Sequence, residues 1–138
     1  MRNANGSKVL VVDDCHDSAD SMCWILSTYG YQVETAYDGL TAIGKARLQR
    51  PDVVLLDLAL PELDGYQVAK ALRDQLAPHA PILVAVTGYG REHDKQRSAA
   101  AGFSHHLLKP VDPAALLDTL AKVLRPARED SRALLPTP

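Results

Sequence analysis

The sequence predicts an α/β fold in which a five-stranded parallel sheet is covered by helices on both faces, a doubly wound arrangement. Short apolar runs bounded by turn residues are typical of strands that are buried on both faces. Segments with apolar residues at helical spacing alternate with these runs, which indicates parallel strands joined by right-handed crossovers. The 138 residues, 46% hydrophobic and 23% charged, suit one globular domain.

The strands are predicted from runs of apolar residues. The clearest run, 53–56, leads directly into Asp57. The segment 31–36 alternates apolar and polar residues, which suits an edge strand. In chain order the predicted strands are 9–12, 31–36, 52–57, 82–87 and 106–108.

A helix is predicted after each strand, and several have a recognisable start. Asp17 or Ser18 is expected to cap the first helix, Asp38 the second, and Asp112, followed by Pro113, the fifth. The fourth helix, about 92–101, has only alanines on its apolar face. The residues expected to face the core are Met22, Ile25, Leu26, Tyr29, Leu40, Ile43, Ala46, Val68, Ala71, Leu72, Leu116, Leu117, Leu120, Val123 and Leu124.

The remaining segments and the composition limit the class of protein. Residues 1–7 are expected to be a flexible N-terminus, 8–125 the domain, and 126–138 a tail or linker. The net charge of −2 does not favour direct binding of nucleic acid, and no apolar run has the ~18 residues of a membrane span. No signal peptide is recognised. Cys15 and Cys23 do not form a C-x-x-C pair, which favours a reduced, cytoplasmic protein.

Polar side chains stand at the carboxyl ends of four predicted strands, where open parallel sheets bind their ligands. These residues are Asp13, Asp14, Asp57, Thr87 and Lys109. Carboxylates that converge repel one another unless a cation neutralises them, and oxygen ligands without histidine favour Mg²⁺. The hydroxyl and the ammonium can bind further anionic oxygens. The sequence therefore predicts a site for a phosphoryl group on or near Asp57, since a carboxylate can form an aspartyl phosphate.

Four motifs, each closing a predicted strand, resemble the receiver domain of two-component response regulators. They are V-L-V-V-D-D, V-V-L-L-D-L-A-L-P-E-L-D-G, V-A-V-T-G and L-L-K-P, and the resemblance extends over residues 8–124. The resemblance implies a flavodoxin-like fold with strand order 2-1-3-4-5. It also implies a signalling domain that accepts a phosphoryl group from a histidine kinase or histidine phosphotransfer protein. Such a domain catalyses only its own phosphotransfer and dephosphorylation.

The resemblance also assigns expected roles to residues. Asp57 would be the phosphoacceptor. Mg²⁺ would bind Asp14, Asp57 and the backbone carbonyl of Ala59, with Asp13 acting mainly through water. Thr87 and Lys109 would contact phosphoryl oxygens, and the bond between Lys109 and Pro110 would be cis.

The family's switch position, usually Tyr or Phe, falls on His106, whose imidazole could make switching depend on pH. Phosphorylation would draw Thr87 inward and change the surface of the fourth helix, fifth strand and fifth helix. That surface would bind a downstream partner, and homodimers through it are a further expectation.

Other functions remain open from the sequence. One is a receiver-like module that binds partners without phosphorylation, a hypothesis supported by His106 at the switch position. Another is an aspartyl-nucleophile phosphatase of the haloacid dehalogenase type, which carries D-x-D-x-T after its first strand. Here the candidate nucleophile follows the third strand, and Ala59 replaces the second aspartate. A flavin-binding domain would require a phosphate-binding loop where Asp13 and Asp14 stand.

Overall fold

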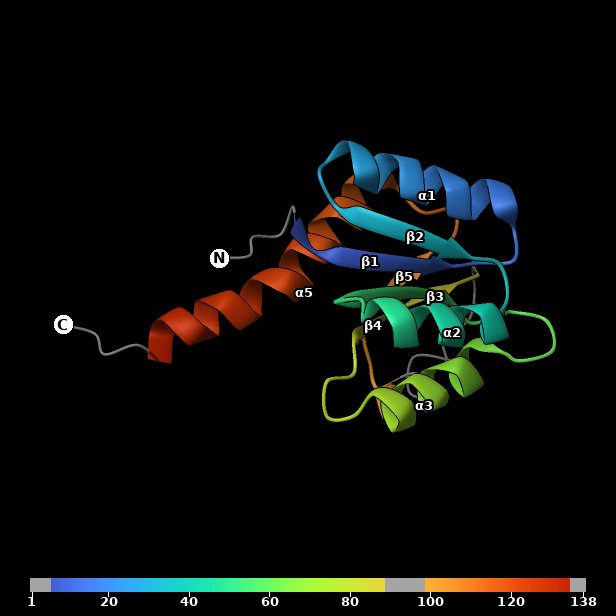
Figure 1. The fold of residues 1–138 in the computed structure, drawn as a ribbon. Helices are drawn as coiled ribbons and strands as arrows, with labels where there is room; N and C mark the ends of the chain where they lie inside the picture. The colour runs from blue at the N-terminus through green and yellow to red at the C-terminus, as the bar shows by residue number, and fades with distance from the viewer. Residues whose placement is uncertain (1–5, 89–98, 135–138) are drawn as a thin grey trace.

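The chain folds into a five-stranded parallel sheet with the strand order β2-β1-β3-β4-β5 (Figure 1). The computed structural model describes residues 6–88 and 99–134, and side chains as far as residue 124. The strands are β1 (Lys8–Val12), β2 (Gln32–Ala36), β3 (Val53–Asp57), β4 (Ile82–Thr87) and β5 (Phe103–Leu108), and the helices are α1 (His16–Thr28), α2 (Gly39–Gln49), α3 (Gly65–Leu76) and α5 (Pro113–Leu134). The predicted fold class is confirmed, together with the strand order that the resemblance implied.

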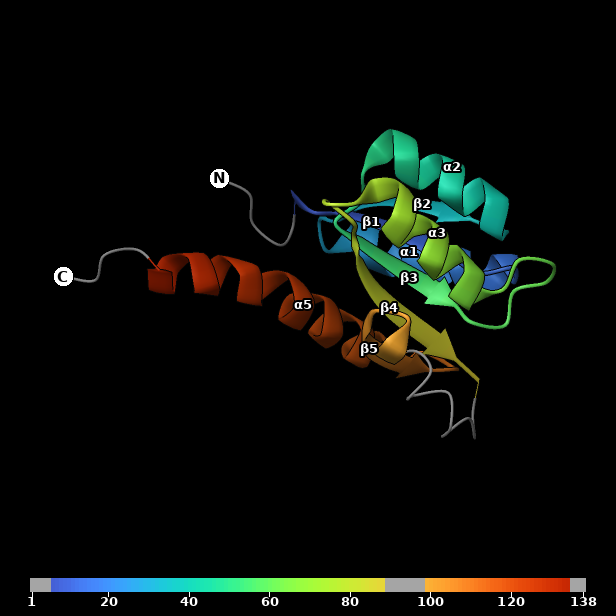
Figure 2. The same cartoon turned by 90° about the horizontal axis from the view of Figure 1, so that it is seen from below.

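Successive residues of the strands face opposite sides of the sheet, so the sheet has two separate cores. On β3, Val53 and Leu55 join the core under α1 and α5, while Val54 and Leu56 join the core under α2 and α3. Figures 1 and 2 show these two helix pairs on opposite sides of the sheet. Burial on both faces explains why β3 is apolar without alternation.

The register of the sheet brings the first and third strand ends together. Val12 of β1 lies opposite Leu56 of β3, so the next residues, Asp13 and Asp57, follow side by side. Asp57 in turn lies opposite Val86 of β4, one residue before Thr87. The site residues therefore gather because parallel strands end at the same edge.

Two helix starts agree with the sequence and one does not. Asp38 accepts a hydrogen bond from the Thr41 amide, and Asp112 accepts one from the Ala115 amide, as expected of N-caps. The expectation that Asp17 or Ser18 caps the first helix is wrong. The N-cap of α1 is Cys15, whose side chain makes no capping hydrogen bond.

Two residues expected in the core are exposed. Tyr29 is 56% exposed because α1 has ended and this residue is its C-cap. Leu40 is 73% exposed, since α2 packs closely through Gly39, Ala42 and Ala46 instead. Because α2 lies so close to the sheet, there is no room for a leucine beneath this helix.

The C-terminal third differs in extent from the prediction. β5 begins at Phe103 rather than at His106, because pairing with β4 carries the polar residues between them into the sheet. α5 continues through Pro126 to Leu134, so the predicted tail or linker 126–138 begins as helix. Both views show the end of α5 projecting beyond the sheet (Figures 1 and 2). The predicted helix 92–101 falls mostly on residues 89–98, which lie outside the described residues.

Two further expectations can be compared with the described part of the chain. The bond between Lys109 and Pro110 is cis, as the resemblance implied, and so is the bond between Ala77 and Pro78. No helix among the described residues is both long and apolar enough to span a membrane.

Candidate phosphoryl and metal site

Three carboxylates meet at the carboxyl edge of the sheet, as the sequence predicts. Asp13, Asp14 and Asp57 each place a carboxylate oxygen within 4.8 Å of the other two. Asp13 and Asp57 are 0% and 4% exposed, whereas Asp14 is exposed. Two acids are thus fixed in the protein, and the third faces solvent.

Lys109 links two of these acids through a single ammonium group. Its Nζ donates a hydrogen bond to Asp57 Oδ2 at 2.8 Å and lies 2.9 Å from Asp13 Oδ2. The Lys109 backbone amide donates to the carbonyl of Thr87 at 2.9 Å. The residue that follows β5 is therefore fixed to the ends of β1, β3 and β4.

Burial and neighbouring charges act in opposite directions on the pKa values of Asp57 and Lys109. Burial raises the pKa of Asp57 above its usual value and the neighbouring Asp13 adds to this, although Lys109 and the Ala59 amide favour the ionised form. Burial alone would lower the pKa of Lys109, but the carboxylates of Asp57 and Asp13 raise it overall. The charged form of Lys109 is therefore stabilised, and its single positive charge does not neutralise all three carboxylates.

The side chains suit a divalent cation such as Mg²⁺. Among the described residues, the buried Oδ2 of Asp13 has the Lys109 ammonium, 2.9 Å away, as its neighbouring cation. All three acidic groups offer hard oxygen ligands, and the exposed Asp14 leaves a side open to water and phosphate. These are the properties of a site in which Mg²⁺ keeps part of its water shell.

The structure assigns Ala59 a contact that the sequence did not suggest. Its backbone amide donates to Asp57 Oδ1 at 2.9 Å, whereas the resemblance implied a role only for its carbonyl. Asp57 is therefore oriented by two donors, Ala59 through one oxygen and Lys109 through the other.

Gly65 packs against the backbone that carries Asp57, a contact that was not predicted from the sequence. A Cβ atom at this position would lie 2.6 Å from the Asp57 carbonyl oxygen and 2.6 Å from Leu58 Cα. The start of α3 therefore packs directly on the backbone that carries Asp57. An Asp-Gly pair a few residues after a strand-end aspartate was the available signal.

Thr87 and His106 lie on the same face of the sheet. His106 pairs with Ala85 of β4, and Thr87 is two residues further along that strand. Thr87 is 6% exposed, and His106 is half-buried on the edge strand. The two residues expected to switch together are thus diagonal neighbours on adjacent strands.

A groove of about 490 Å³ opens beside Lys109, between α1 and the start of α5. Its lining residues are Cys15, Ser18, Ser21, Met22, Ile25, Lys109, Pro110, Val111 and Leu116. The groove offers a partly apolar surface next to the charged site, and no pattern in the sequence predicted it.

Comparison with known proteins agrees with this geometry. A family model described as the response regulator receiver domain matches residues 9–121. The protein PilH of Pseudomonas aeruginosa is 34% identical over 118 residues, which cover 86% of this chain and 98% of PilH. PhoP of Bacillus subtilis, an alkaline phosphatase synthesis transcriptional regulatory protein, is 37% identical over 86% of this chain, which spans only 48% of PhoP.

Solved structures show the same likeness. The chemotaxis protein CheY4 of Vibrio cholerae has a TM-score of 0.81 and 36% sequence identity. The aligned region covers 86% of this chain and 99% of that one.

Proposed function

The chain belongs to the response regulator receiver domain family, and on this premise we propose that Asp57 accepts a phosphoryl group from a phosphohistidine. The supporting observation is the placement of Asp57: buried, beside two further acids, and hydrogen-bonded to Lys109 at 2.8 Å. A strand-end carboxylate with only a structural role would need neither a cluster of like charges nor a shared ammonium.

In the proposed reaction, an oxygen of the Asp57 carboxylate attacks phosphorus and the bond from phosphorus to the imidazole nitrogen breaks. The donor histidine leaves as neutral imidazole, either because its other ring nitrogen already carries a proton or because the leaving nitrogen takes one as the bond breaks. The Ala59 amide and the Lys109 ammonium keep Asp57 ionised and oriented until the reaction. Lys109 then donates to the phosphoryl oxygens in place of the carboxylate.

Asp14, Asp57 and the Ala59 carbonyl would hold Mg²⁺, with Asp13 binding through water. The ion would neutralise charge that accumulates on the transferring phosphoryl group. Asp13 also holds Lys109 close to the reacting atoms, 2.9 Å from its own Oδ2.

Thr87 and His106 would carry the signal away from the site. The Thr87 hydroxyl would turn to the phosphoryl oxygens, and the space that it leaves would be open to His106 on the same face of the sheet. The surface of the fourth helix, β5 and α5 would then bind a different partner or a second copy. We place the protein in the cytoplasm, where histidine kinases and histidine phosphotransfer proteins present their phosphohistidines.

Intact mass spectrometry tests the proposal directly. The protein is incubated with a small acyl phosphate and Mg²⁺, and three chains are compared: wild type, Asp57→Asn and Asp52→Asn. Asp52 is a matched control because it stands at the opposite end of the same strand, where it accepts a hydrogen bond from the Lys8 amide. Wild type and Asp52→Asn should each gain one phosphoryl group, and Asp57→Asn none.

Folding is checked by circular dichroism in all three chains. If folded wild-type protein gained no phosphoryl group, the proposal would be wrong, and a module that binds its partners without phosphorylation would take its place.

A further inference from the structure

The outward face of α2 has an unusual pattern for a helix that faces solvent. Leu40 and Leu48 stand four residues on either side of Gly44, and they are 73% and 86% exposed. Residues at this spacing share one face of a helix. Two large apolar side chains thus flank a glycine on a surface that no described residue covers.

Gly44 is not explained by packing within its own chain. A glycine inside a helix destabilises it relative to alanine. At Gly39 and Gly65 an added Cβ would meet atoms 2.8 Å and 2.6 Å away, which explains those glycines. At Gly44 an added Cβ would meet nothing within 4 Å. The missing side chain therefore leaves a notch that is open to the outside.

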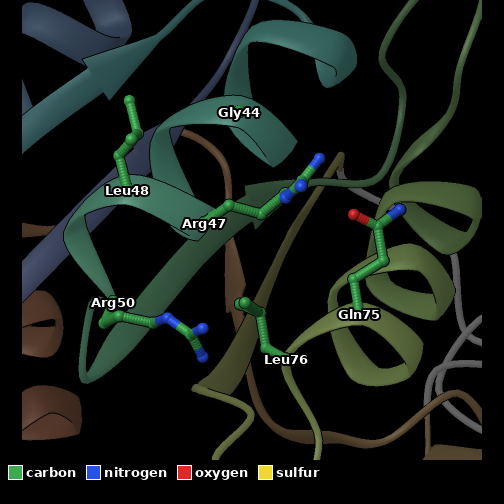
Figure 3. Close-up of a pocket in the computed structure, with 6 residues that line it drawn as sticks. All are labelled: Gly44, Arg47, Leu48, Arg50, Gln75 and Leu76. Carbon is green, nitrogen blue, oxygen red and sulfur yellow. The ribbon is translucent and has the colours of Figure 1, made fainter.

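A basic hollow lies at the C-terminal end of this face. It has a volume of about 480 Å³ and is lined by Gly44, Arg47, Leu48, Arg50, Gln75 and Leu76. Figure 3 shows Arg47 extending from α2 towards Gln75 of α3, and Arg50 extending towards Leu76. Among the residues with described side chains, neither arginine has a carboxylate partner.

An acidic hollow lies at the N-terminal end of the same face. It has a volume of about 230 Å³ and is lined by Asp38, Gly39, Leu40, Pro61, Glu62 and Leu63. Its walls are largely apolar, and its two carboxylates are exposed. The α2 face therefore carries a leucine and an acidic hollow at one end, and a leucine and a basic hollow at the other.

We propose that the α2 face (Leu40, Gly44, Arg47, Leu48 and Arg50) pairs with the same face of a second copy of this chain. The two helices run antiparallel and cross at Gly44. Leu40 of each copy then faces Leu48 of the other, because the two leucines lie symmetrically about residue 44 on one face of the helix. The basic hollow of one copy meets the acidic hollow of the other.

The pattern favours a second copy over an unrelated partner. A two-fold interface requires a surface that is complementary to itself after rotation, and the hollows at the two ends of this face carry opposite charges. A glycine at the crossing point lets two helices approach closely. Antiparallel helices also place the positive end of one dipole beside the negative end of the other.

The interface should be weak. Stable protein interfaces bury roughly 1,200–2,000 Å² in total, and one 11-residue helix with its flanking hollows falls at or below the lower end. We therefore expect a dissociation constant in the range of about 10 μM to 1 mM. Association of this strength suits a contact that is completed only at high local concentration.

Cysteine cross-linking tests the antiparallel geometry. In a chain whose native cysteines are replaced (Cys15→Ser, Cys23→Ser), Gly44→Cys should form disulfide dimers on mild oxidation, because the two copies of residue 44 face each other across the two-fold axis. A mixture of Leu40→Cys and Leu48→Cys chains should cross-link to each other far more than either chain does to itself. Lys122→Cys, exposed on α5, is the control for random collision.

Either of two results would overturn the proposal. One is Gly44→Cys dimers no more abundant than Lys122→Cys dimers. The other is self-cross-linking of Leu40→Cys and of Leu48→Cys that exceeds cross-linking between them, which indicates parallel pairing. All four positions are exposed or open to solvent, so the variants should fold, and thermal melts verify this.

Charge exchange tests the complementarity by sedimentation velocity. Arg47→Glu alone or Glu62→Lys alone should weaken dimerisation by roughly two- to fivefold, because each reverses a charge in one of the two hollows that meet. The double variant should recover much of the wild-type affinity. Gly44→Gln should remain folded and fail to dimerise. Wild-type protein that stays monomeric at about 1 mM, or a double variant weaker than either single one, would refute the pairing.

Discussion

Replacing Gly65 by alanine should destabilise this fold although alanine is usually the better helix former. The added Cβ would lie 2.6 Å from the Asp57 carbonyl oxygen and 2.6 Å from Leu58 Cα, distances that real Cβ atoms essentially never show. Both neighbours are backbone atoms of the strand end, so neither can rotate away as a side chain can. Either α3 or the backbone of Asp57 and Leu58 must move.

The expected cost is that of overpacking a rigid core, about 1–3 kcal/mol. For a domain of this size it corresponds to a fall in melting temperature of roughly 4–12 °C, at about 4 °C per kcal/mol. Gly44→Ala provides the matched control, since its Cβ meets nothing within 4 Å. Relief of the glycine entropy should raise stability there by roughly 0.5–1 kcal/mol.

Calorimetry at low micromolar concentration, where the chain is monomeric, measures both variants. The phosphorylation rate of Gly65→Ala with a small acyl phosphate should also fall, because the displaced backbone carries Asp57. A Gly65→Ala protein as stable as Gly44→Ala would refute the reasoning, since the same substitution would then have the same effect in crowded and open surroundings.

Three further predictions concern the charged site. Asp57→Asn should stabilise the fold at neutral pH. Because the pKa of Asp57 is raised in the folded protein, the contribution of this side chain to folding stability is present at low pH, where it is protonated, and is lost as the pH rises. In denaturant titrations, the free energies of unfolding of wild type and Asp57→Asn should converge at acidic pH. A difference in these free energies that widened at acidic pH would contradict the prediction. Mg²⁺ at ten times its dissociation constant should stabilise wild type by about 1.4 kcal/mol, and Asp13→Asn or Asp57→Asn much less, in thermal melts with and without the ion. Lys109→Met should destabilise the protein by roughly 3 kcal/mol or less, because two buried carboxylates lose their shared ammonium; an unchanged unfolding midpoint in urea would show that the ammonium contributes little.

Much of the fold followed from the sequence because its strongest signals are local. Four consecutive apolar residues before Asp57 correspond to a strand buried on both faces, and Asp38 and Asp112 cap helices as their positions indicate. The positions of Asp13, Asp57 and Lys109 also followed, since parallel strands end at one edge and the register then fixes which side chains meet.

The departures arise where packing with distant segments decides. Leu40 was expected in the core from its helical spacing, but α2 approaches the sheet so closely that only small residues fit beneath it. The polar start of β5 gave no strand signal of its own and is held by its pairing with β4. The contact of Gly65 with the Asp57 backbone depends on the angle at which α3 leaves the loop.

Lys109 joins the ends of three strands. Its ammonium pairs with acids at the ends of β1 and β3, and its backbone amide donates a hydrogen bond to the carbonyl at the end of β4. A single event that draws this ammonium to a new anion therefore loosens two strand ends at once and pulls on a third. Chemical acylation of this one amine would remove the same two supports without any change at Asp57. The Asp57 carboxylate would then stay chemically unchanged but lose the cation that now holds it to β1.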